Sequence, residues 1–256
     1  MKISPFYASY PDLTKTPTDD AFFETIKEQY AEYKASGMFL EAAKEAVYVY
    51  QIETLGTPGE KFTGLVACAD TEDYLNNQIR KHEHTIVKNE QMQLELLKDR
   101  AASIKPILLS FPIVPAFDTL LLEYIANHSP FYTITIESEK HTFWQASETS
   151  FLSDINQVFE QHIPIAYIAD GHHRTSTVAM LSKSGIPGAS KLLSAFFPIN
   201  QLRIRAYHRV VEGLNGLTAD AFLHELTPLF VIKVLRKPTA PHRSLGMTMC
   251  LNGDWF

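Results

Sequence analysis

The chain has 256 residues, of which 45% are hydrophobic and 20% charged, and its 23 basic and 29 acidic side chains give a formal net charge of −6. This balance is typical of a globular protein and excludes a disordered acidic tail or a fibrous repeat. An acidic chain is also poorly suited to general nucleic-acid binding, because neutralising phosphates needs a basic face. We expect no signal peptide at Met1–Pro5 and no membrane span. Two cysteines without a CxxC motif, Cys68 and Cys250, indicate a reduced cytoplasmic protein.

The first half of the chain mixes helical and β-type patterns. Apolar residues at helical spacing predict a helix over Asp19–Ser36 that ends near Gly37. Two β-rich runs around a Gly/Pro turn, Ala46–Ile52 and Lys61–Ala69, predict a hairpin. The other elements expected here are a helix, a second helix, a buried strand and a third helix, at Asp73–Lys81, Val87–Ala102, Pro106–Phe111 and Asp118–Ala126.

The second half continues this mixture. A further hairpin is predicted over Tyr132–Glu137 and His141–Gln145, followed by a helix that starts near Ser150. The apolar strand Ile163–Ala169 then runs directly into a helix that ends near Gly185. Three more strands and one helix are expected, the strands at Lys191–Phe197, Leu202–Tyr207 and Phe230–Leu235 and the helix at Thr218–Leu226. Because strands and helices do not alternate regularly, the predicted fold class is α+β, with a mixed, largely antiparallel sheet and packed helices.

The last ten residues have a hairpin pattern. Alternating apolar residues precede Asn252-Gly253, which is the strongest short signal for a hairpin turn. Three residues follow this turn, whereas a typical strand has about five or six. We therefore expect residues 1–256 to form a single α+β domain that is the N-terminal and larger part of a longer chain. The alternative is a natural end that frays.

The most unusual segment is DGHHR, Asp170–Arg174, where the predicted strand meets the predicted helix. The first turn of a helix has unpaired N–H groups and the positive end of the helix dipole, which favour an anion. Gly171 lets a ligand approach the backbone, and Arg174 is able to clamp a phosphate or carboxylate. The alternative is an ordinary aspartate cap, but a cap does not require two histidines and an arginine in succession.

Two further polar clusters complete the candidate site. His82–Thr85 (HEHT) offers Glu83 as a general base and Thr85 as a helix cap, with a solvated loop as the alternative. Tyr207-His208-Arg209 follows a predicted strand and is otherwise a polar strand end. The candidate catalytic residues are Glu83, Asp170, His172 and His173. The candidate ligand-binding residues are Gly171, Arg174, Thr175, Ser176, His82, Thr85, His208 and Arg209.

A dedicated metal site is not expected, although the chain has ten histidines. Neighbouring histidines such as His172 and His173 point about 100° apart on a helix, so they do not readily bind one ion together. No HExxH motif is present. Magnesium bound to a nucleotide is easier to accommodate, because it needs one or two carboxylates and phosphate oxygens.

Together these segments resemble a family of bacterial and archaeal proteins catalogued as number ten-fifteen among the domains of unknown function. The segments that carry the resemblance are AVYVYQ, FTGLV, DYLNNQIRKHEHT, YIADGHHRTSTV and AYHRVV, at Ala46–Gln51, Phe62–Val66, Asp73–Thr85, Tyr167–Val178 and Ala206–Val211. They occur in the family's order over most of the chain. The Pro-Pro-Tyr-Asp-Val segment common near the family's N-terminus is missing here, and members continue beyond the pair matching Trp255-Phe256.

A more distant resemblance concerns Gly171–Arg174, which is similar to the Gly-x-x-Arg helix start of the ParB/sulfiredoxin superfamily. In that superfamily the motif holds nucleotide phosphates, so the resemblance implies a fold that is ParB/sulfiredoxin-like in part. Sulfiredoxin has a cysteine where His172 stands, which implies that this chain lacks sulfinic-acid reductase activity. No DNA-binding region like that of the partition proteins follows the motif. Small-molecule phosphoryl transfer is then the closest analogue.

These observations lead to a functional hypothesis. We expect a nucleotide, such as ATP or ADP with Mg²⁺, or another phosphorylated small molecule to bind at Asp170–Thr177 and to undergo phosphoryl transfer or hydrolysis. A binding or regulatory module for an anionic metabolite, without turnover, is the first alternative. A metal-dependent hydrolase is the second. The partner is a small molecule, and neither a membrane nor general nucleic-acid binding is expected.

Overall fold

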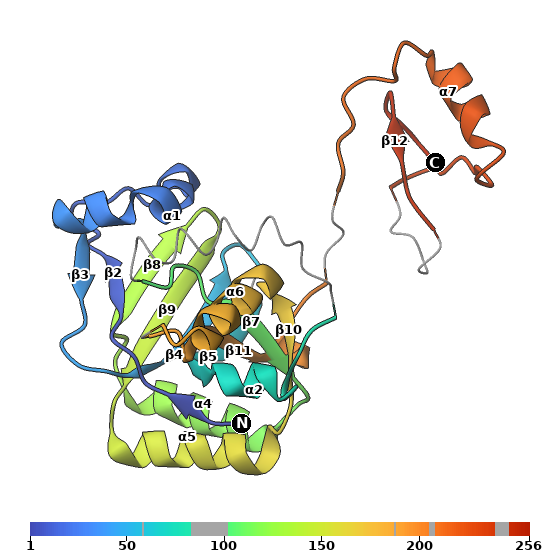
Figure 1. Cartoon of the computed structure of the whole chain (residues 1–256). Coiled ribbons are helices and arrows are strands. Elements are labelled where there is room, and N and C mark those ends of the chain that lie inside the picture. The colour runs from blue at the N-terminus through green and yellow to red at the C-terminus, as the bar shows by residue number, and fades with distance from the viewer. Residues whose placement is uncertain (58, 83–101, 187, 205–207, 239–245) are drawn as a thin grey trace. The chain divides into compact units, whose positions relative to one another are not determined.

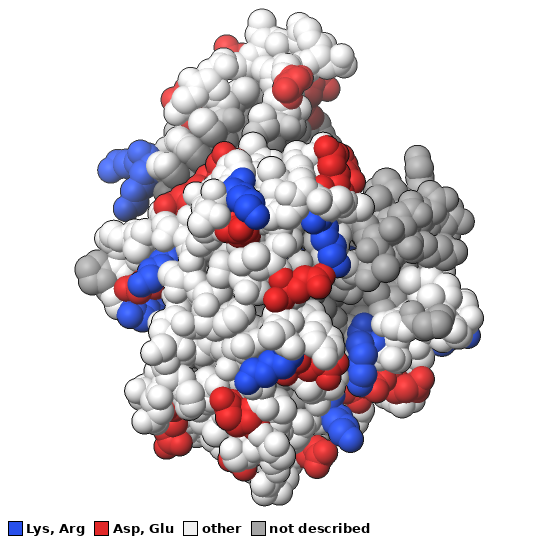
Figure 2. Space-filling model, turned by 90° about the vertical axis from the view of Figure 1, so that its left-hand side faces the viewer, with Lys and Arg blue, Asp and Glu red and all other residues white. Residues whose placement is uncertain are grey.

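The computed structural model describes residues 1–57, 59–82, 102–186, 188–204, 208–238 and 246–256 (Figure 1). They form two compact units, Met1–Leu202 and Arg203–Phe256. Among the described residues, no helix combines the length and apolar character needed to cross a membrane. On the face shown in Figure 2, lysines and arginines are interspersed with aspartates and glutamates over a mainly uncharged surface.

The larger unit is built around a nine-stranded mixed sheet. Its strands in spatial order are β6 (Ile79–Arg80), β10 (Ala166–Asp170), β7 (Ile107–Phe111), β11 (Lys191–Pro198), β5 (Lys61–Asp70), β4 (Val47–Thr54), β9 (Glu139–Ala146) and β8 (Tyr132–Ile136), and β1 (Ile3–Ser4) also pairs with β5. The β6–β10 and β7–β11 pairs are parallel, and the other pairs described in this sheet are antiparallel. The predicted α+β class with a largely antiparallel mixed sheet is confirmed, and so are both predicted hairpins, β4–β5 and β8–β9.

Helices flank this sheet. They are α1 (Asp20–Ala35), α2 (Thr71–Leu75), α4 (Pro115–Asn127), α5 (Thr149–His162) and α6 (His172–Lys183), with a short 3₁₀ turn, η1 (Ile199–Gln201), after β11. The Asp19 side chain accepts a hydrogen bond from the Phe22 N–H and so caps α1 as a short polar residue should. Beside α1 lies a small two-stranded sheet of β2 (Ser9–Pro11) and β3 (Phe39–Glu41), visible in Figure 1.

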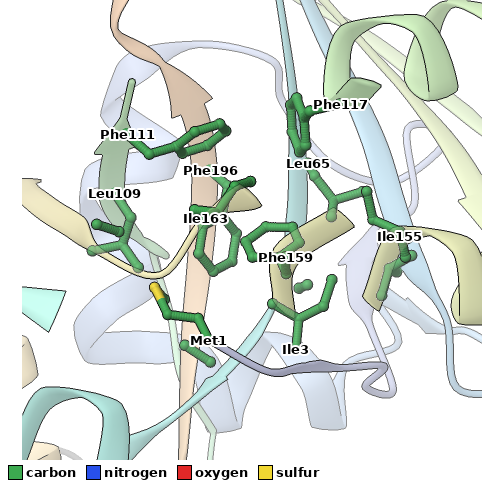
Figure 3. Close-up of a cluster of buried hydrophobic side chains, with 14 of the residues drawn as sticks. Met1, Ile3, Leu65, Leu109, Phe111, Phe117, Ile155, Phe159, Ile163 and Phe196 are labelled. Carbon is green, nitrogen blue, oxygen red and sulfur yellow. The ribbon is translucent and has the colours of Figure 1, made fainter. Parts of the chain in front are cut away.

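The main core lies between one face of the sheet and the helices α4 and α5. Every second residue of a strand points to the same face, which is how Val47, Val49 and Leu65 reach this layer. Phe159 of α5 is fully buried there, and its ring lies 4.9 Å from that of Phe196 and 6.0 Å from that of Phe117 (centroid distances; Figure 3). Aromatic rings packed at steep angles in this way provide a large share of the buried apolar surface.

The opposite face of the sheet carries a second, more aromatic cluster. It contains the buried side chains of Tyr48, Val66 and Phe197. Gly64 of β5 is needed for this packing, because a Cβ atom there would lie 2.5 Å from the Phe196 carbonyl oxygen and 2.8 Å from the Phe197 ring. Its other members come from strands, from N-terminal residues such as Phe6, from Phe131 before β8 and from Leu202 after η1.

The smaller unit contains α7 (Ala219–Leu226) and a short hairpin of β12 (Cys250–Leu251) and β13 (Asp254–Trp255). Asn252 and Gly253 both have positive φ, 51° and 92°, as the favoured two-residue hairpin turn requires. The turn predicted from the Asn-Gly sequence is therefore confirmed.

Other sequence predictions were wrong in part. The helix expected over Asp73–Lys81 is a short helix, Thr71–Leu75, followed by the strand Ile79–Arg80. The chain leaves the helix through Asn77, which has a φ of 62°, and β6 then pairs with β10 far along the chain. The strand expected over Phe230–Leu235 is absent among these described residues, apart from one bridge between Leu235 and Trp255. The expected helix at residues 87–102 falls outside the described residues except for the last.

Candidate functional site

The candidate site begins where β10 passes into α6. β10 ends at Asp170, and Gly171 precedes α6 with φ 103° and ψ 26°, a left-handed conformation that glycine adopts at little cost. Gly171 is the N-cap residue, and no side chain makes a capping hydrogen bond to the start of α6. The alternative of an ordinary aspartate cap is therefore not what the structure shows. Because no side chain caps the backbone N–H groups of the first helical turn, these groups are suited to bind an anion.

The Arg174 side chain links α6 to the segment before β7. Its Nη1 donates to the carbonyl oxygens of Lys105 and Pro106, and its Nη2 donates to Oδ2 of Asp170, each at 2.6 Å. Burial lowers the pKa of the guanidinium, while the Asp170 carboxylate acts in the opposite direction. Lys105 has a φ of 70°, which is uncommon for a residue with a side chain, at the point where its carbonyl meets Arg174. The sequence predicted that the Arg174 charge contributes to this site, but it did not predict these two backbone acceptors.

Three histidines lie at the start of α6. The ring of His82 stands edge-on to the ring of His172, with centroids 4.4 Å apart and an interplanar angle of 87°. His172 is buried, while His173 is partly exposed and its Nδ1 has no hydrogen-bond partner within the described part of the chain. The structure thus brings His82 of the HEHT segment to the DGHHR segment, although 90 positions separate His82 from His172.

This meeting depends on the short parallel pair of β6 and β10. Ile79 pairs with Ala166, and Arg80 with Tyr167, so the carboxyl ends of both strands point the same way. His82 after β6 and Asp170 at the end of β10 therefore lie at the same end of the strands. In many sheets with parallel strands, ligands bind at this carboxyl end.

The predicted hydroxyl ligands differ in their surroundings. Thr175 is fully buried, and its Oγ1 donates to the Gly171 carbonyl oxygen at 3.0 Å. The neighbouring Thr177 makes a similar bond to the carbonyl oxygen of His173 at 2.8 Å. Ser176 is partly exposed. The predicted ligand contacts of Thr175 and Ser176 stay predictions.

Four predicted site residues stay predictions. Glu83 and Thr85 fall outside the described residues. His208 and Arg209 belong to the smaller unit, where both side chains are exposed. Within the described residues, no group of three or more histidine, cysteine, aspartate or glutamate side chains is arranged to hold a metal ion.

One family model matches nearly the whole chain. It is described as protein of unknown function (DUF1015) and matches residues 8–256. The chain belongs to this family. The DUF1015 match spans both compact units and includes every candidate site residue. No solved structure matches the chain. The ParB/sulfiredoxin resemblance of the Gly171–Arg174 segment, unlike the membership in DUF1015, stays a prediction.

A substitution at Gly171 tests how closely the atoms are packed at the junction between β10 and α6. A Cβ atom there would lie 2.9 Å from Cγ2 of Ile107 and 3.1 Å from Nη2 of Arg174, in a backbone conformation that already disfavours a side chain. We expect Gly171→Ala to lower the free energy of unfolding by about 2–3 kcal/mol, measured by urea denaturation. Gly185→Ala is the matched control at the other end of α6, because Gly185 also has positive φ but would meet nothing within 4 Å. It should cost about 1 kcal/mol. Equal losses in the two variants would contradict a sterically crowded junction.

Proposed function

We propose that the start of α6 binds the phosphate of a nucleotide or another phosphorylated small molecule, and that the histidines there support phosphoryl transfer or hydrolysis. The observation that carries this proposal is the meeting of His82 and His172 at a helix start that no side chain caps. Helix N–H groups and the positive end of the dipole stabilise phosphate charge. Gly171 adopts the left-handed conformation that turns the chain from β10 into α6.

The chemistry requires a proton acceptor and a proton donor on opposite sides of the phosphorus atom. An alcohol or water oxygen attacks phosphorus and gives its proton to one imidazole, while the bond to the leaving oxygen breaks and that oxygen takes a proton from a second acid. His173 and His82 are the histidines of this group that reach the surface, and they are suited to these two roles. His172 is buried, and its ring contacts the ring of His82. Where the attacking oxygen is a substrate hydroxyl, Glu83 is the candidate base in place of one imidazole.

Asp170 is the residue of this site that would coordinate magnesium bound to a nucleotide. The side chain of Asp170 is 63% exposed even though one of its oxygens accepts a hydrogen bond from Arg174. A carboxylate that remains in water while held by one arginine is suited to the partial coordination that Mg²⁺ uses together with phosphate oxygens. We place this activity in the cytoplasm, consistent with the two free cysteines.

The proposal is tested by calorimetric titration of the full chain with inorganic phosphate, ADP and ATP, with and without Mg²⁺, followed by assays of phosphate release and transfer. His173→Gln and His82→Gln should reduce turnover by about 10²- to 10⁴-fold while changing nucleotide affinity only a few-fold. His162→Gln is the matched control, because His162 is an exposed histidine in the last turn of α5. Absence of binding by phosphate and by both nucleotides at millimolar concentration would overturn the proposal.

A binding module without turnover is the second candidate, and one observation favours it. The site's one described acidic side chain, Asp170, is engaged by Arg174, so it is poorly placed to take a proton from a substrate. This candidate predicts that a nucleotide or phosphate binds and is recovered unchanged. Glu83→Gln would then alter neither binding nor any rate, whereas under the catalytic proposal it abolishes turnover and leaves affinity nearly intact.

A further inference from the structure

A cavity lies on the aromatic face of the sheet. It has a volume of about 250 Å³ and is lined by strands β2, β4, β5, β8 and β9, by the segment around Phe131 and by Phe23 of α1. Figure 1 shows β2 and α1 beside β8 and β9 in the larger unit. Tyr48 of this cavity alternates with Val47 and Val49, which point into the main core, so the cavity opens on the face opposite α4 and α5.

The walls of this cavity are uncharged. No lysine, arginine, histidine, aspartate or glutamate is among the described residues that line it. Its polar side chains are Ser9 and three tyrosines, and burial raises the pKa of Tyr48 above its ordinary value and that of Tyr132 to about 12. These two phenols therefore stay neutral at physiological pH. A charged ligand would lose its hydration here without gaining a partner of opposite charge.

The aromatic walls support one another. The ring of Tyr10 meets the ring of Phe131 at 5.1 Å and 76°, and that of Tyr132 at 5.1 Å and 60°. Phe131 also meets Tyr48 at 5.8 Å, and Tyr132 meets Phe143 at 6.3 Å. Rings held by edge and tilted contacts of this kind keep their positions, so a ligand entering the cavity would not have to order its walls.

One of the three phenols at this cavity makes no hydrogen bond to the described residues. Tyr132 Oη donates to the Pro11 carbonyl oxygen at 3.0 Å, and Tyr48 Oη accepts from Nε2 of Gln145 at 3.2 Å. The structure gives the Tyr10 hydroxyl no such partner among the described residues. Tyr10 is therefore the phenol available to exchange a hydrogen bond with a guest.

The size of the cavity limits the guest. An apolar cavity of about 150 Å³ is enough to bind benzene, and pockets for drug-sized ligands begin at about 300 Å³. A volume of about 250 Å³ lies between these values. We propose that this cavity binds an uncharged, planar aromatic molecule of one or two rings, with one polar group directed at Tyr10. This site is independent of the phosphate site proposed at α6.

The test uses the full chain and two probes of nearly the same shape, 2-naphthol and 2-naphthoate, in calorimetric or fluorescence titrations. We expect 2-naphthol to bind at least tenfold more tightly than 2-naphthoate, because the cavity offers the carboxylate no partner. Tyr10→Phe should weaken 2-naphthol binding about fivefold, the effect of one neutral hydrogen bond. Ala8→Phe, which places a ring in the cavity without removing any wall, should weaken it at least tenfold.

Several outcomes would overturn this proposal. One is equal affinity for the two probes, and another is unchanged 2-naphthol affinity in an Ala8→Phe protein that retains a cooperative unfolding transition. Sedimentation tests the rival occupant, a second copy of this chain. If the unmodified chain forms a dimer that Ala8→Phe dissociates, the cavity belongs to an interface between copies and not to a small molecule.

Discussion

Replacing Arg174 with methionine should lower the free energy of unfolding by about 2–4 kcal/mol. The Arg174 side chain is only 21% exposed and makes three hydrogen bonds of 2.6 Å, two of them to backbone carbonyls at Lys105 and Pro106. Hydrogen bonds that involve a charged group contribute about 1.5–3 kcal/mol each, and they share the cost of ordering one side chain. Methionine keeps much of the apolar stem but leaves these carbonyls and Asp170 without the guanidinium. Urea denaturation measures the loss.

Two further variants separate geometry from charge. Arg174→Lys keeps the charge but presents it as a single compact ammonium, which cannot span acceptors on two segments as a planar guanidinium does. It should therefore recover less than half of the loss. Lys183→Met removes an exposed charge in the last turn of the same helix and should change stability by less than about 0.5 kcal/mol. A loss below 1 kcal/mol in Arg174→Met would show that the three bonds are not a structural link.

Replacing Phe159 with alanine should destabilise the larger unit more than any other change considered, by about 3–5 kcal/mol. Phe159 is fully buried, and its ring contacts those of Phe111, Phe117 and Phe196, which come from two strands and another helix. Removal of the ring leaves a cavity that three separate elements would have to fill. The shift in the denaturation midpoint at unchanged m-value measures this effect.

The neighbouring residue provides the control for this change. Glu160 lies next to Phe159 on α5, and its side chain is exposed. Glu160→Ala should leave the free energy of unfolding within about 0.5 kcal/mol of the unmodified chain. If Phe159→Ala were tolerated equally well, the core between α4, α5 and the sheet would not be the main source of stability.

Local patterns were sufficient to predict the elements whose partners are close in sequence. The β4–β5 and β8–β9 hairpins show alternation around a turn, and α5 shows apolar residues at helical spacing. β6 was mistaken for helix because its two residues take their conformation from β10, more than 80 positions away. A segment of two residues is too short to show the alternation of a strand, so its pairing with a distant strand is not predictable from its own sequence.

The candidate site was predictable in its composition but not in its contacts. The clustering of polar residues at Asp170–Arg174 marked the start of α6, and the structure adds that His82 reaches it. The acceptors of Arg174 at residues 105 and 106 are backbone carbonyls, and a pattern of side chains does not predict backbone acceptors. The aromatic cavity was missed, although alternating aromatic residues in β4 and in the β8–β9 hairpin were a signal that could have found it.

The position of β6 at the border of the sheet has a consequence for motion. Two residues pair β6 with β10, and the Ala166 N–H donates to the Gln78 carbonyl oxygen at 2.9 Å just before the pair. So short a strand exchanges its amide hydrogens through local opening, at a much lower free energy than the long central strands β4 and β5. Each such opening separates His82 from His172 while the core around Phe159 stays folded. The amide exchange rate of Ala166 would therefore report how often the histidine cluster disassembles, and a bound phosphate should slow it.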